Sequence, residues 1–153
     1  MEINLYIVEK GAKKSIETPM IEHYLKLCSP WARVKIHSIF DKKIAKAQES
    51  GPEQAQKSYT EALVRYLQPG YSITLDPLGE MVDSHQFSRQ MEGRNRLNFF
   101  IGGAYGFERE FLEQSNKSVS FGRITLSHRL VKVVLLEQIF RGLSLIHNHP
   151  YHK

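Results

Sequence analysis

The stretch RLNFFIGGAYGF, residues 96–107, gives the clearest indication of how this chain folds. Its first half is a short run dominated by apolar residues, which predicts a buried strand over 96–101. Gly102 and Gly103 end that strand abruptly and leave the backbone bare at its exit, where something must approach it closely. Taken singly, however, a glycine more often only makes a tight turn.

The rest of the chain alternates strand and helix patterns around this stretch. Further strands are predicted over 3–8, 33–40, 71–75 and within 118–126. Helical spacing predicts a first helix that is capped by Ser15 or Thr18 and stops at Ser29-Pro30. A later helix begins at Asp83 or Ser84 and stops at Gly93. Further helices are predicted over 55–67, 107–114 and about 128–145. Residues 41–52 are polar and form the only linker-like stretch.

This alternation predicts an α/β fold with a mostly parallel sheet that is covered by helices on both faces. A length of 153 residues suits a single domain over 1–153. Ligands of such sheets bind at the carboxyl ends of the strands. We therefore expect the chemistry at three strand exits: LDPLGE (75–80), IGGAYGF (101–107) and FGRITLSH (121–128).

Composition indicates a globular protein with an excess of positive charge. Apolar residues make up 41% of the chain, and 21 Lys and Arg against 16 Asp and Glu give a net charge of +5. That excess suits nucleic acid, or it belongs to a merely soluble basic protein. The single cysteine, Cys28, excludes an intramolecular disulfide and favours the cytosol. We see neither a signal peptide nor a run of membrane-spanning length.

The predicted last helix is apolar around most of its circumference, which a helix with one buried face does not need. It is therefore either sandwiched in the core or packed against another subunit. For a small protein, a homodimer is the more economical interpretation.

Common nucleotide and metal motifs are absent from the sequence. It contains no GxxxxGK[ST], no GxGxxG after the first strand, no HExxH and no paired CxxC. Three of the seven histidines lie in the last seven residues, HNHPYHK (147–153), but no acidic or thiol ligand is near them. A zinc site there is a minor alternative.

The motifs TLDPLG (74–79), FFIGGAYGF (99–107) and ITLSHRLVKVVLLEQIFRGLSLIHNHPYHK (124–153) resemble the ribosomal RNA large subunit methyltransferase H family. These are the pseudouridine-N3 methyltransferases of the SPOUT superfamily. The resemblance covers the whole chain and is most specific at the NHPYHK ending. It implies an α/β fold with a C-terminal trefoil knot, a homodimer, and a cytoplasmic enzyme without a metal.

The resemblance also implies S-adenosylmethionine as methyl donor, bound in the knot against the three strand exits. The matching cofactor-binding positions are Leu75, Gly102, Phe121, Gly122, Arg123, Ile124, Thr125 and Leu126. Backbone groups and aliphatic side chains suit the flat, apolar faces of adenine. The family's substrate is a pseudouridine in a hairpin loop of 23S ribosomal RNA, methylated at N3 on the assembled 70S ribosome. The resemblance implies neither a membrane nor a DNA partner.

N3 of pseudouridine carries a proton at neutral pH and must lose it before it can accept a methyl group. A positioned general base contributes about 10²–10⁴-fold, and histidine titrates in the right range. We expect His152 and Tyr151 to contact the target base as catalytic residues, with Lys153 on RNA phosphate. His128 is a weaker candidate on the substrate side, while His147 and His149 are expected to be structural or solvated.

Three other functions stay open at this point. A non-catalytic basic RNA-binding dimer would bind ribosomes with or without S-adenosylmethionine. A SPOUT methyltransferase for transfer RNA would act on free transfer RNA. A metal-dependent hydrolase built on the C-terminal histidines would contain zinc and lose activity with a chelator.

Overall fold

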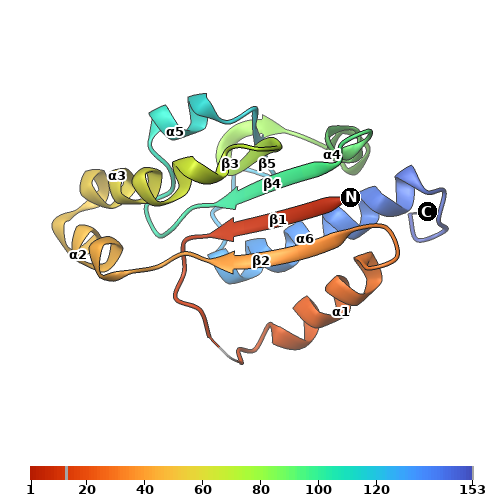
Figure 1. The fold of residues 1–153 in the computed structure, drawn as a ribbon, viewed down its shortest axis with the longest axis horizontal. Coiled ribbons are helices and arrows are strands. Elements are labelled where there is room, and N and C mark those ends of the chain that lie inside the picture. The colour runs from red at the N-terminus through yellow and green to blue at the C-terminus, as the bar shows by residue number, and fades with distance from the viewer. Residues whose placement is uncertain (13, 153) are drawn as a thin grey trace.

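The computed structural model describes residues 1–12 and 14–152, which form a five-stranded parallel sheet (Figure 1). Its strands, in the order β2-β1-β4-β3-β5, are all paired in parallel. They are β1 (Glu2–Ile7), β2 (Arg33–Ser38), β3 (Tyr71–Met81), β4 (Arg96–Ile101) and β5 (Lys117–Ser120). The α/β prediction is confirmed, and all the strand exits lie at one edge of the sheet.

The central strand β1 shows why helices cover both faces. Successive side chains of a strand point to opposite faces. Ile3, Leu5 and Ile7 therefore enter one hydrophobic cluster, while Tyr6 and the following Val8 enter the other. A strand buried on both sides has to be apolar nearly throughout, which is the pattern that the sequence displays.

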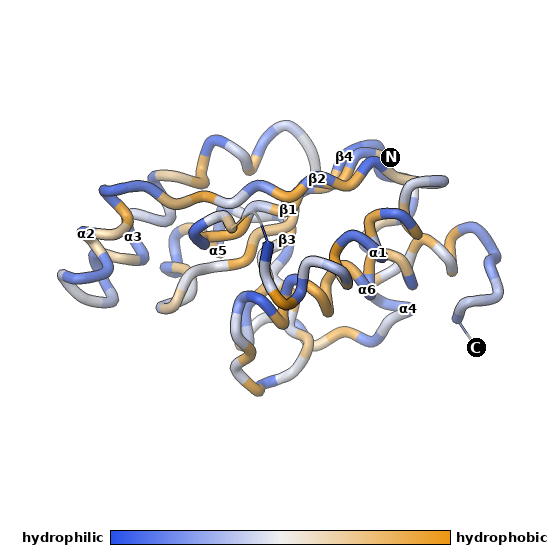
Figure 2. Tube along the Cα trace, turned by 90° about the horizontal axis from the view of Figure 1, so that it is seen from below, coloured by the Kyte–Doolittle hydropathy of each residue, from blue (hydrophilic) through white to orange (hydrophobic). Residues whose placement is uncertain are grey.

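Each cluster is closed by its own set of helices. The first contains side chains of α1 (Thr18–Cys28), α4 (Ser84–Met91) and α6 (His128–Ile146). The second contains side chains of α2 (Lys42–Ser50), α3 (Pro52–Leu63) and α5 (Arg109–Gln114). Figure 2 shows α1, α4 and α6 grouped on one side of the sheet. No helix within the described residues is long and apolar enough to cross a bilayer.

The linker predicted over residues 41–52 is wrong, because most of it is the helix α2. Asp41 caps this helix: its carboxylate accepts a hydrogen bond from the Ile44 amide at 2.8 Å. Ile44 is the only fully buried residue of α2. A helix that buries one side chain carries almost no apolar periodicity, so its sequence resembles a loop.

Several predicted boundaries also differ from the structure. Strand β3 runs past Leu75 to Met81 through a register shift, whereas β5 ends at Ser120 and leaves residues 121–127 as a loop. Helix α3 ends at Leu63 and continues only as a short 3-10 turn, and α5 begins at Arg109. The N-cap of α1 is Glu17, without a side-chain cap, so neither Ser15 nor Thr18 has that role. Asp83 does cap α4, in a capping box with Gln86.

Helix α6 is sandwiched between the sheet and the helices α1 and α4 over its second half. Leu135, Leu136, Ile139, Phe140 and Leu143 are all buried there. Its first turn differs, since Leu130 is 58% exposed. The prediction that this helix is sandwiched in the core is therefore confirmed for its second half. Its first turn retains an uncovered apolar side chain, that of Leu130.

Candidate functional site

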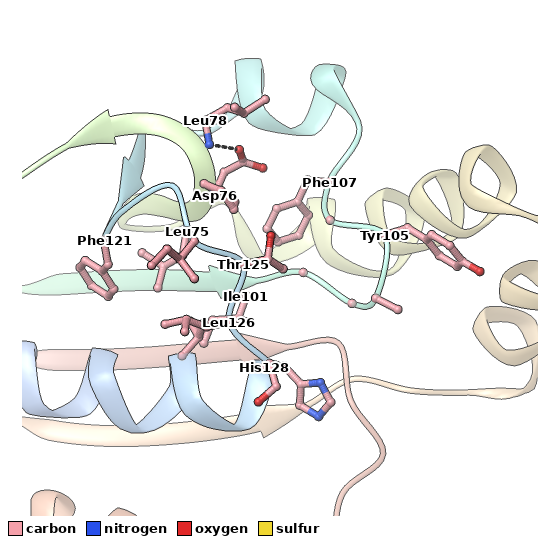
Figure 3. A pocket seen from close by; sticks show the side chains of 18 of the residues that line it. Leu75, Asp76, Leu78, Ile101, Tyr105, Phe107, Phe121, Thr125, Leu126 and His128 are labelled. Atoms are coloured by element: carbon pink, nitrogen blue, oxygen red, sulfur yellow. Dashed lines mark hydrogen bonds between the residues drawn. The ribbon is translucent and has the colours of Figure 1, made fainter.

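A cavity of about 810 Å³ opens where β3, β4 and β5 end (Figure 3). Its walls come from three segments that are far apart in the sequence: 75–78, 101–107 and 121–128. These are the three strand exits that the sequence singled out. The start of α6 and Gln56 of α3 complete the wall. The volume lies within the usual range for small-molecule sites.

The structure brings together nearly all of the predicted cofactor-binding residues around this cavity. They are Leu75, Gly102, Phe121, Gly122, Ile124, Thr125 and Leu126, and the predicted substrate residue His128 lies on the same wall. Arg123 is the exception: it is exposed and does not line the cavity. The role of Arg123 as a cofactor contact therefore stays a prediction.

Two turns are joined to form one side of the cavity. The Ser120 hydroxyl lies 3.1 Å from the Pro77 carbonyl oxygen and 2.9 Å from the Gly122 carbonyl oxygen, and it accepts from the Gly122 amide. A Cβ at Gly79 would lie 2.9 Å from the backbone of Ser118 and Val119, so only glycine lets β3 approach β5 there. These contacts fix the 75–79 and 120–122 segments relative to each other.

Gly102 and Gly103, in the 101–107 exit, are closely packed against other parts of the chain. A Cβ at Gly103 would lie 2.7 Å from the Tyr59 ring, and one at Gly102 would lie 3.1 Å from the backbone of Gly106. The Gln56 side-chain amide donates to the Tyr105 carbonyl at 2.8 Å and ties the turn to α3. The glycines are needed for a tight turn, and that turn shapes the wall.

A buried cluster of charges lies directly behind His128. The Lys132 ammonium donates to Glu9 Oε1 at 2.8 Å and lies 3.6 Å from Glu17 Oε1. All three side chains are more than nine-tenths buried. His128 Nε2 lies 3.4 Å from the other oxygen of Glu9, which links the cluster to the cavity wall.

Of the two buried carboxylates in this cluster, Glu17 is the less well satisfied by hydrogen bonds. Burial raises the pKa of its carboxyl, but its own backbone amide, the Ser15 side chain, Lys132 and Arg129 outweigh that effect, so the net pKa lies below the usual value. One of its oxygens has no hydrogen-bond partner among residues 1–12 and 14–152. Because the folded-state pKa is lowered, its ionised form stabilises the fold at neutral pH, and this contribution is lost as the pH falls through that pKa.

The C-terminal tail has an ordered start. Asn148 adopts the left-handed conformation (φ 53°), its amide donates to the Leu145 carbonyl at 3.3 Å, and the His149 amide donates to the Ser144 carbonyl at 2.8 Å. This is a Schellman motif, in which asparagine is a common substitute for glycine. The His147 ring stacks on Trp31 at 5.2 Å and the His149 ring meets it edge-on, in agreement with structural roles for both.

Tyr151 and His152 fold back onto the end of α6. The Tyr151 hydroxyl donates to Glu137 Oε1 at 3.2 Å, and burial, followed by Glu137 and Tyr24, raises the pKa of this phenol to about 12. His152 Nδ1 lies 3.2 Å from Arg141 Nη1. Since a guanidinium can only donate, this nitrogen must be the acceptor, and the neutral ring then carries its proton on Nε2. His152 therefore presents an Nε2–H donor, whereas the proton of the Tyr151 hydroxyl is already donated to Glu137. Lys153 lies outside the described residues.

The cavity and the tail lie at opposite ends of α6. His128, the first residue of this helix, is on the cavity wall, whereas the tail follows its last residue, Ile146. A helix of 19 residues is about 28 Å long at 1.5 Å per residue. Figure 1 shows that α6 ends on the side of the molecule where the strands begin. One chain therefore does not bring Tyr151 and His152 to its own cavity.

Sequence reasoning missed several residues of the site. Asp76, Tyr105 and Gln56 line the cavity, but they were not singled out. Glu9 and Lys132 are 123 positions apart, and nothing in the sequence pairs them. Residues 1–12 and 14–152 hold no group of three or more His, Cys, Asp or Glu side chains arranged to bind a metal ion.

Replacing Lys132 with methionine should destabilise the fold strongly. It leaves two buried carboxylates without their shared cation, for which we expect a loss of about 3–5 kcal/mol in the free energy of unfolding. Chemical denaturation measures this loss. Lys43→Met removes an equal charge from a surface pair with Glu61 and should cost less than about 1 kcal/mol. Equal losses for the two variants would contradict the role of Lys132.

Comparisons with known proteins agree with this arrangement. A family model described as "Predicted SPOUT methyltransferase" matches residues 1–152. The ribosomal RNA large subunit methyltransferase H of Sulfurovum sp. is 56% identical over 153 residues, which is all of both chains. Proteins of the same name from Aliarcobacter butzleri and Campylobacter concisus are 44% and 39% identical, again over all of both chains. The chain therefore belongs to the SPOUT methyltransferases and, among these, to the ribosomal RNA large subunit methyltransferase H family.

Proposed function

We propose that this chain transfers a methyl group from S-adenosylmethionine to N3 of a pseudouridine in a hairpin loop of 23S ribosomal RNA. It would do so in the cytoplasm, as a homodimer, on the assembled 70S ribosome. The observation that carries the proposal is the cavity, because all the predicted cofactor positions except Arg123 converge on it from three separate strand exits. The relatives' common name, which specifies ribosomal RNA of the large subunit, supports the substrate class.

The residues present fit the proposed methyl donor. Leu75, Ile101 and Leu126 offer aliphatic surface for the faces of an adenine, and the bare backbone around Gly102 and Gly106 offers amides and carbonyls for its polar edge. S-adenosylmethionine would supply an activated methyl group in this cavity. The chain's own contribution is to hold and orient the reactants, which is the main source of acceleration in such a transfer.

A homodimer is supported by an uncovered apolar surface near the cavity. Arg129 lies 3.9 Å from Glu17, which places the first turn of α6 beside the first turn of α1. Around this junction the chain exposes large apolar side chains on the two helices and the preceding loops. They are Ile16, Met20, Ile124, Leu126 and Leu130. A second copy would remove them from water, which is the usual reason for such a patch.

A dimer would also bring together the two predicted halves of the site, the cavity and the C-terminal tail, which lie apart in one chain. If the two copies of α6 lie antiparallel, the tail of each copy reaches the cavity of the other. One subunit then holds the methyl donor, and its partner supplies Tyr151, His152 and Lys153 to the target nucleotide. The trefoil knot expected from the superfamily stays a prediction alongside this arrangement.

The side chains of the tail suit the chemistry at N3, which lies between two carbonyl groups of the base. N3 would lose its proton to solvent water, which leaves negative charge on the oxygens of those carbonyls; N3 would then bond to the methyl carbon as the bond from that carbon to sulfur breaks. His152 Nε2–H is a donor that would stabilise this charge, and the Tyr151 ring would stack on the target base. His152 would therefore act as a catalytic donor to the anionic base, and Lys153 would pair with phosphate. The net charge of +5 per chain would strengthen binding to the ribosome.

The proposal is tested by the transfer of labelled methyl from S-adenosylmethionine to RNA. Assembled 70S ribosomes that lack the modification, isolated 50S subunits and bulk transfer RNA are compared, and the labelled nucleoside is identified. We expect label in 70S ribosomes as N3-methylpseudouridine. Label in transfer RNA alone would identify the transfer RNA methyltransferase instead. Ribosome binding without any transfer would identify the non-catalytic dimer.

Removal of the imidazole of His152 should affect catalysis rather than folding. His152→Ala loses one donor to the developing anion, for which we expect kcat to fall by about 10²–10³-fold. His152→Gln keeps an N–H donor and should recover part of that loss. His149→Ala, in the same tail but against Trp31, should retain nearly wild-type kcat. Wild-type turnover by His152→Ala would remove His152 from the mechanism.

A further inference from the structure

The cavity contains one carboxylate, that of Asp76, in a wall that is otherwise mostly aliphatic, aromatic or backbone. No other acidic side chain in the described part of the chain lines it. Asp76 makes no ion pair with any of the described residues, whereas the buried carboxylates Glu9 and Glu17 share Lys132. An anion without a partner in a ligand cavity requires an explanation.

The orientation of this carboxylate is fixed. Asp76 Oδ1 accepts a hydrogen bond from the Leu78 amide at 2.8 Å, across a turn of three residues. The turn itself is anchored, since the Ser120 hydroxyl donates to the Pro77 carbonyl and Gly79 is packed against β5. Figure 3 shows the second carboxylate oxygen directed away from Leu78. One oxygen therefore shapes the turn, and the other remains available to a ligand.

The charge of this free oxygen determines which ligands the cavity accepts. A ligand that fills the cavity displaces water from the carboxylate, and a desolvated anion is costly unless it gains a cation. A neutral nucleoside offers none. S-adenosylmethionine carries positive charge at its sulfonium and at its α-ammonium group. Either cation would compensate the carboxylate for the water that it loses.

We propose that Asp76 is the counter-charge for the positive charge of the methyl donor, and so a specificity-determining residue of the cavity. This inference rests on the proposed function, because it takes S-adenosylmethionine as the ligand. Asp76 thus selects a cationic nucleoside over a neutral one of the same shape. Leu75 and Leu126 hold the nucleoside in either case.

The test compares the dissociation constants of three probes by calorimetry, using the full-length protein and Asp76→Asn. Asparagine keeps an oxygen for the Leu78 amide but removes the charge, so the turn stays folded. We expect S-adenosylmethionine to bind Asp76→Asn on the order of tenfold or more weakly. Methylthioadenosine, which lacks both cationic groups, should bind the variant as tightly as the wild type or more tightly. The control Glu80→Gln removes the same charge from the end of β3, outside this cavity. It should leave the dissociation constants of S-adenosylmethionine and methylthioadenosine unchanged.

S-adenosylhomocysteine then identifies the cation that Asp76 meets. It retains the ammonium group but has a neutral sulfur, so unchanged binding to Asp76→Asn assigns the sulfonium and weakened binding assigns the ammonium group. Equal weakening of all three probes, or of none, would overturn the proposal. If wild-type protein binds none of the three, the proposed function itself fails. Thermal unfolding of Asp76→Asn near the wild-type temperature confirms that the variant is folded.

Discussion

The buried helix α6 fixes the distance between the two chemically rich ends of this chain. Its 19 residues make it about 28 Å long. Its second half is held between the sheet and the helices α1 and α4, so it has no freedom to bend the tail back towards the cavity. The cavity at its start and the residues Tyr151 and His152 at its end therefore lie far apart in one subunit. A site that needs both has to be built from two subunits.

The start of α6 is held as firmly as its end, but by charge rather than by apolar packing. Lys132 joins Glu9, which follows β1, to Glu17, at the start of α1. Replacing all three by apolar residues would often be neutral or stabilising, so the cluster is better explained by what it positions than by what it contributes to stability. Through Glu9 the cluster contacts His128 on the cavity wall, and through Glu17 it contacts Arg129 in the first turn of α6.

Much of the fold and of the cavity could be predicted from the sequence, because both depend on local patterns. The apolar run 96–101 followed by Gly102 predicts a buried strand and its exit, and Asp83 is a readable helix cap. Helix α2 could not be predicted in this way, since it buries only Ile44. Asp76 was missed because its role depends on the absence of a partner, which only the folded structure reveals. The contact between Glu9 and Lys132 has no local signal.

The most direct test of the composite site mixes two inactive variants. Thr125→Trp blocks the cavity and keeps the tail, whereas a Tyr151→Ala/His152→Ala double variant keeps the cavity and loses both tail side chains. After unfolding and refolding an equal mixture, half of the dimers are mixed and each has one intact site of two. We therefore expect about one quarter of the wild-type methyl transfer to 70S ribosomes. No recovery, from mixed dimers shown to have formed, would contradict a site shared between subunits.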